Sequence, residues 1–141
     1  MTASTPTSAD YGAFVLRVTL GVLAFAHGFI LKVLTFTPAG TAGYFESIGY
    51  PGALAYLVIL AEVAGGLALI FGVLPRLAAI GLVPVLIGAT LQHVGNGWGF
   101  SSTGGGWEFP AAWTVLLVAS ALIGPGAFAL DNVRSRSAVA A

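Results

Sequence analysis

Five side chains that can carry charge or exchange protons lie within or beside long apolar stretches of the sequence: His27, Lys32, Glu62, His93 and Glu108. An ionisable side chain in hydrocarbon costs roughly 2.5–3.5 kcal/mol, so those kept there usually serve a function. Histidine and lysine can donate hydrogen bonds to a quinone carbonyl, and histidine and glutamate can supply the proton that its reduction needs. The sequence therefore predicts a polar pocket for a quinone or similar head group, with the catalytic residues unassigned.

A purely structural interpretation of these residues stays open, because paired charges can also fix how helices pack. For Glu62 and His27, which lie deepest, we favour function. Glu108 could instead serve as a helix-start residue, since a negative charge suits a helix N-terminus and Pro110 stands at a first-turn position. Arg17 and Arg76 are interpreted as structural anchors whose charged ends extend to the cytoplasmic interface.

Several kinds of cofactor site receive little support. The chain has no cysteine, which excludes thiolate metal sites, iron–sulfur clusters and disulfides. His27, His93 and Glu62 are too few to predict a metal site. The two histidines could ligate a haem between helices, but two histidines are a weak signal and we do not expect haem b. No strand–GxGxxG–helix unit is present, so any flavin or nicotinamide belongs to a partner.

The composition identifies the class of protein. Of 141 residues, 57% are hydrophobic and 7% are charged, with 5 Lys and Arg against 5 Asp and Glu. Soluble domains carry about a quarter charged residues. So few charges exclude a soluble globular monomer, and the absence of a basic stripe excludes a nucleic-acid-binding protein. The chain is expected to be an integral membrane protein, with the lipid bilayer as its first partner.

The apolar residues fall into stretches that can hold the five side chains in place. The stretches cover about 11–34, 52–74, 77–94 and 109–123, and their continuous rather than alternating pattern indicates membrane helices. We predict an all-α, integral membrane four-helix bundle over 11–126, with a disordered polar tail over 1–10 and a polar tail over 127–141. A short amphipathic segment at 44–48 is expected to lie at the membrane interface.

Lysine and arginine positions predict the orientation. Four spans place both termini on one side, and that side would hold Arg17, Arg76, Arg134 and Arg136 against Lys32 on the other. Positive residues favour the cytoplasm, so both termini are predicted to be cytoplasmic. His27 and His93 would then lie about 22 and 24 Å above the cytoplasmic helix starts. The polar pocket is therefore expected in the outer half of the bundle.

A set of motifs runs through most of the chain in a fixed order. They are Arg17-x3-Gly21, His27-Gly28, Lys32, Gly49-Tyr50-Pro51, Glu62 with Gly65-Gly66, Gly72-Val73-Leu74-Pro75-Arg76, Gly105-Gly106-Trp107-Glu108-Phe109-Pro110, and Gly124-Pro125-Gly126 with Asp131. In order and spacing this set resembles the DoxX-like membrane proteins, from Leu16 to Asp131.

The chain departs from this family pattern in two places. Three residues, Phe29-Ile30-Leu31, separate His27-Gly28 from Lys32, where the family usually has two. In an α-helix a spacing of five turns Lys32 about 140° away from His27, so we expect no direct partnership between them. Phe109 stands where the family often has a tyrosine, which removes one hydroxyl.

The resemblance implies a multi-pass inner-membrane protein of a bacterium. The family takes its name from a thiosulfate:quinone oxidoreductase, which implies a subunit of a quinone-linked oxidoreductase or redox-stress system that works with a membrane or peripheral redox enzyme. The chain has no catalytic motif of its own. Two alternatives remain: a non-catalytic assembly or scaffold protein for a partner enzyme, and a small proton-coupled transporter, which would need a homodimer to enclose enough volume.

Overall fold

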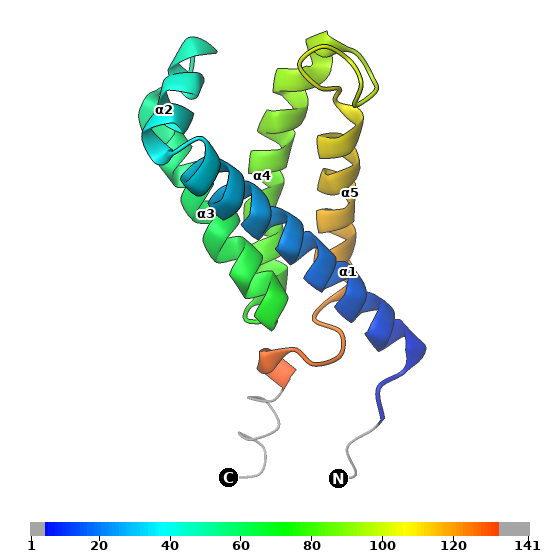
Figure 1. The fold of residues 1–141 in the computed structure, drawn as a ribbon. Coiled ribbons are helices and arrows are strands. Elements are labelled where there is room, and N and C mark those ends of the chain that lie inside the picture. Colours follow the sequence, from blue (N-terminus) through cyan, green and yellow to red (C-terminus); the bar gives the residue numbers. More distant parts are fainter. Residues whose placement is uncertain (1–4, 133–141) are drawn as a thin grey trace.

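The computed structural model describes residues 5–132, and within them every regular element is a helix (Figure 1). The elements are α1 (Ser8–Phe25), the π-helix η1 (Ala26–Thr35), α2 (Pro38–Ser47), α3 (Gly52–Phe71), α4 (Pro75–His93), the 3₁₀-helix η2 (Val94–Asn96) and α5 (Glu108–Ile123). η1 continues α1 without a break. The prediction of an all-α protein is confirmed.

Among residues 5–132, three helical segments are long and apolar enough to cross a membrane: Ser8–Thr35, Gly52–Phe71 and Pro75–Asn96. The fourth predicted stretch is the apolar helix α5, which has 16 residues. Predicted and observed boundaries differ most at the start of α1 and at the end of α3. This helix ends at Phe71 rather than near 74, because Gly72 adopts the left-handed conformation with φ of 70°.

The first helix begins earlier than the sequence suggested. The hydroxyl of Thr7 accepts a hydrogen bond from the backbone N–H of Asp10, and the Asp10 carboxylate accepts one from the backbone N–H of Thr7. This reciprocal pair satisfies donors that would otherwise be exposed at the helix start. The helix therefore begins at Ser8, so the predicted tail over 1–10 is wrong at its C-terminal end. Residues 1–4 of that tail lie outside the described part of the chain.

The predicted interfacial segment at 44–48 belongs to a longer helix, α2. Thr37 caps it by accepting a hydrogen bond from the backbone N–H of Gly40, and Pro38 occupies the first helical position. Thr41 is buried, and its hydroxyl lies 3.1 Å from the carbonyl oxygen of Lys32 and 2.9 Å from that of Thr37, either of which can accept its hydrogen. α2 is thereby tied to the end of η1 and packs on α3.

The long helices pack in a cycle, with α1 on α3, α3 on α4, α4 on α5 and α5 on α1 (Figure 1). Glycines allow the closest approach. A Cβ atom on Gly21 would lie 2.8 Å from the carbonyl oxygen of Gly66, and one on Gly28 would lie 2.8 Å from the Cβ of Glu62. These contacts bring the backbones of α1 and η1 against α3, as small residues do between membrane helices.

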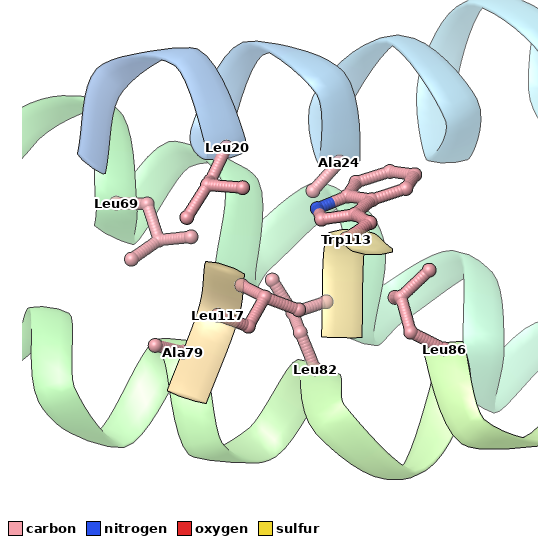
Figure 2. Packing of buried hydrophobic residues seen from close by; sticks show 8 residues of the cluster. All are labelled: Leu20, Ala24, Leu69, Ala79, Leu82, Leu86, Trp113 and Leu117. Atoms are coloured by element: carbon pink, nitrogen blue, oxygen red, sulfur yellow. The ribbon is translucent and has the colours of Figure 1, made fainter. Parts of the chain in front are cut away.

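A hydrophobic core joins the four long helices in the part of the molecule away from α2. Figure 2 shows its buried members: Leu20, Ala24, Leu69, Ala79, Leu82, Leu86, Trp113 and Leu117. Many large apolar side chains instead lie on the outside, including Leu57, Leu77, Leu91 and Leu122. An apolar exterior is what a bilayer requires, because lipid rather than water covers it.

Arg17 does not extend to the interface. It is fully buried, and its guanidinium donates to the carbonyl oxygens of Leu69, Ile70, Pro125 and Ala127. Residues 69 and 70 stand at the end of α3, where helical carbonyls lack intrahelical partners. The predicted charged end at the interface is therefore wrong for Arg17, which joins α3 to the segment after α5. Arg76 is exposed and lies beside Gly124.

The described part of the predicted C-terminal tail packs on the helices. The backbone N–H of Ala127 donates to the carbonyl of Asp10, and the Asp131 carboxylate accepts from the backbone N–H of Leu74 at 2.9 Å. Residues 127–132 therefore cover the end of the molecule where α1 begins. Arg134 and Arg136 lie outside the described residues.

Candidate functional site

A cavity of about 1110 Å³ lies at the end of the molecule that carries α2 and the loop before α5. η1, α2 and α3 form one side of it, and α4 and α5 form the other. Figure 1 shows the α1–α3 pair and the α4–α5 pair diverging toward this end. Its lining includes all five polar side chains singled out from the sequence: His27, Lys32, Glu62, His93 and Glu108. Side chains from four separate segments, η1, α3, α4 and α5, are thus brought to one cavity.

Most of the remaining lining is apolar. Aromatic side chains come from α2 and the segment after it, from the loop before α5, and from α5: Tyr44, Phe45, Tyr50, Trp98, Phe100, Phe109 and Trp113. Ligand pockets are typically apolar cavities with a few polar groups that fix the orientation of the ligand. The cavity has this character.

The polar centre of the site is an ion pair between η1 and α3. The Lys32 ammonium lies 2.6 Å from one oxygen of the Glu62 carboxylate and 2.9 Å from the other. Glu62 is 5% exposed and Lys32 is 20% exposed. Gly28 faces the Cβ of Glu62, so η1 runs close to this part of α3. Each charge therefore compensates the other in a region that water scarcely reaches.

The π-helix explains how Lys32 reaches this position. In η1 hydrogen bonds connect residues five apart, and the last of them runs from the N–H of Phe36 to the carbonyl of Leu31. Each turn of a π-helix holds more residues than an α-turn, so residues five apart lie closer to the same side. The estimate of 140° between His27 and Lys32 assumed an α-helix and does not apply. Lys32 nevertheless pairs with Glu62 rather than with His27.

Each of the two histidine rings is held by a hydrogen bond to the backbone carbonyl four residues earlier in its helix. His27 Nδ1 lies 2.9 Å from the carbonyl oxygen of Leu23, and His93 Nδ1 lies 2.7 Å from that of Ala89. The His27 ring also packs against Trp113, with 5.0 Å between ring centroids, and near Phe109 at 6.3 Å. Both imidazoles are thus oriented by their own helices, and both line the cavity.

Glu108 begins α5 and also holds the adjacent loop. One of its carboxylate oxygens accepts a hydrogen bond from the backbone N–H of Phe100 at 2.9 Å. Trp98 and Trp107 of the same loop pack edge to face, with ring centroids 4.6 Å apart. Glu108 therefore combines the structural role at a helix start with a place in the cavity wall.

The sequence reasoning missed Gln92 and the tyrosines of the lining. Gln92 lies next to His93 in the apolar helix α4 and lines the cavity. A polar amide inside a predicted span was a usable signal for it. Tyr44 and Tyr50 had no such signal, because their place at the cavity depends on how α2 folds over α3. Within residues 5–132 no group of three or more potential metal ligands occurs.

Comparisons with known proteins identify one family and two relatives. The sequence model described as DoxX matches residues 12–95. "Inner membrane protein YqjF" of Escherichia coli (strain K12) is 34% identical over 128 residues, which are 90% of this chain and 95% of that protein. "Putative oxidoreductase CatD" of Bacillus subtilis (strain 168) is 34% identical over 84 residues, 60% of each chain. No solved structure matches the chain.

Proposed function

The chain belongs to the DoxX family of membrane proteins, and on that premise we propose that it is a membrane subunit of a quinone-linked redox system. The observation that carries this proposal is the shared cavity. Five ionisable side chains from η1, α3, α4 and α5 line one apolar hollow of about 1110 Å³. Pockets for small molecules usually measure roughly 300–1,000 Å³, so a quinone head group with part of its tail is of suitable size.

The residues of the cavity can play distinct parts around such a ligand. The aromatic side chains provide an apolar wall for a ring, and His27 and His93 provide hydrogen-bonding nitrogens. Glu62 and Glu108 carry oxygens that can accept a hydrogen bond or a proton. Electrons would come from or pass to a partner redox enzyme, in keeping with the name of the relative CatD. We propose no metal and no haem.

The arrangement in the membrane is also part of the proposal. α5 would cross as the fourth span, although its 16 residues give only about 24 Å of helix against about 30 Å of hydrocarbon. The start of α1, the turn with Arg76 and residues 124–132 would face the cytoplasm of a bacterial cell. α2 and the cavity would face the periplasmic side. The exposed Arg76 and the additional Arg134 and Arg136 support this orientation.

A scaffold function is the second candidate, and the Lys32–Glu62 pair favours it. A buried ion pair can specify how two helices align without any ligand. The chain would then hold a partner enzyme in the membrane. A proton-coupled transporter would additionally require a second copy of the chain.

Binding of a short-chain quinone and of its reduced quinol to the purified protein in lipid nanodiscs tests the proposal. We expect saturable binding of at least one of the two forms to the unaltered chain, and at least tenfold weaker binding of the form that binds more tightly to Glu62→Gln and His27→Ala. Glu46→Gln is the matched control, because Glu46 is exposed on α2 and does not line the cavity. Unchanged binding by both cavity variants would overturn the site. No binding by the unaltered chain, with capture of a partner enzyme, would favour the scaffold. A reducible Soret band would contradict the absence of haem.

A further inference from the structure

The hydrogen bonds of the two histidines determine which atoms they can offer to a ligand. A backbone carbonyl can only accept, so the hydrogen in each bond to Leu23 and Ala89 belongs to the histidine Nδ1. A neutral imidazole carries one N–H, which leaves its Nε2 as an acceptor. Nε2 of His93 lies on the loop side of its ring, 3.8 Å from where a Cβ of Gly105 would stand. In the neutral form, both histidines therefore present acceptors rather than donors at Nε2.

The other polar groups of the cavity also favour hydrogen-bond acceptors over donors. Two bonds of the Lys32 ammonium go to Glu62, which restricts the main donor of the site. The carboxylates of Glu62 and Glu108 can only accept, and Glu108 uses one oxygen for the N–H of Phe100. Gln92 carries both a donor and an acceptor.

One further donor is out of reach. The indole nitrogen of Trp113 is buried and has no hydrogen-bond partner in the described structure. Although the ring of Trp113 lines the cavity, this nitrogen has almost no accessible surface. Tyr44, Tyr50 and Trp98 also line the cavity and carry donors, but these side chains are largely exposed, and the tyrosine hydroxyls can accept as well. At the histidines and carboxylates, acceptors therefore outnumber the donors that a bound molecule could reach, and a ligand with carbonyl oxygens alone would leave most of these acceptors unpaired.

We propose that the cavity selects the reduced form of its ligand, a dihydroxy aromatic quinol, over the oxidised quinone. This inference rests on the proposed function and narrows it to one redox form. The two hydroxyl groups of a quinol are donors, and the Nε2 atoms and carboxylates are their acceptors. A quinone of the same ring has only acceptor oxygens. Its ring would gain the same contacts with Phe109 and Trp113 but would lack the hydrogen bonds.

The test compares three ligands that share one ring and one tail. Decylubiquinol, decylubiquinone and the dimethyl ether of decylubiquinol are titrated anaerobically against the full chain in nanodiscs. We expect the quinol to bind about tenfold more tightly than the quinone, the ratio that one to two net hydrogen bonds supply. The dimethyl ether has lost its donors and should bind no more tightly than the quinone.

Substitutions of the histidines then test whether these residues cause the preference for quinol over quinone. His27→Phe and His93→Phe retain an apolar ring but lose the acceptor, so each should reduce the ratio between quinol and quinone rather than abolish binding. Glu46→Gln should leave the ratio unchanged. Quinone affinity equal to or above that of the quinol in the unaltered chain would overturn the preference while the proposed function stands. Failure of all three ligands to bind would overturn the proposed function itself.

Discussion

The Lys32 ammonium and the Glu62 carboxylate lie 2.6 Å apart although 30 residues separate them in the sequence. Their contact joins η1 to α3 at the inner end of the cavity. It also limits hydrogen bonding in the site, because two of the three N–H donors of the lysine are taken by the carboxylate.

Removing one member of the pair should destabilise the fold more than removing both. Glu62→Gln or Lys32→Met leaves a mostly buried charge without its partner, and we expect a loss of about 3 kcal/mol in the free energy of unfolding. The double variant should recover more than half of that loss. Denaturant unfolding of the single and double variants in mixed micelles measures the coupling free energy of the pair. If the two single losses add up in the double variant, Lys32 and Glu62 do not interact directly.

Arg17 should control the segment that follows α5. Arg17→Met leaves the carbonyls of Leu69, Ile70, Pro125 and Ala127 without their shared donor. Hydrogen exchange at the amide of Ala127, which donates to Asp10, should then accelerate at least tenfold. Arg76→Gln is the control, since Arg76 is exposed. Equal exchange in the two variants would show that Arg17 does not hold this segment.

The π-helix should tolerate the loss of one residue. Deleting Ile30 restores the spacing usual in the family, and an ordinary α-helix can then place the lysine on the side of His27. We expect this deletion to keep the fold and the ion pair. Lys32→Met in the deletion background should still cost stability. Deleting Val22 in the regular part of α1 is the matched control, which should rotate Arg17 away from α3 and prevent folding.

Close packing of α1 on α3 should depend on Gly21. A Cβ at this position would lie 2.8 Å from the Gly66 carbonyl, so Gly21→Ala should lower the free energy of unfolding by about 1–3 kcal/mol. Gly81→Ala is the matched control, because nothing lies within 4 Å of its Cβ position and alanine favours helix. A melting temperature reduced equally by both substitutions would argue against the close approach.

The membrane topology can be measured by labelling single introduced cysteines, because the sequence contains no cysteine. We expect Ser47→Cys at the end of α2 to react with a membrane-impermeant maleimide on intact spheroplasts. Thr5→Cys, before α1, should react only after permeabilisation. Labelling of both positions from outside would contradict a membrane crossing by Ser8–Thr35.

The helical membrane class, the approximate helix ranges and the family could be predicted from sequence because they depend on local properties. The length of an apolar run, the near absence of charge and the order of short motifs need no knowledge of neighbouring helices. For the same reason the five polar residues of the cavity could be selected from sequence. An ionisable residue inside an apolar stretch can be recognised whichever way its side chain points.

The tertiary structure decided how those polar residues are used. Arg17 has its acceptors 52 to 110 residues away, so its burial could not be read from its place near the start of a span. Lys32 reaches Glu62 through a π-helix, which an angular estimate for an α-helix cannot anticipate. Both outcomes depend on the register between packed helices, and that register is set by contacts among segments far apart in the chain.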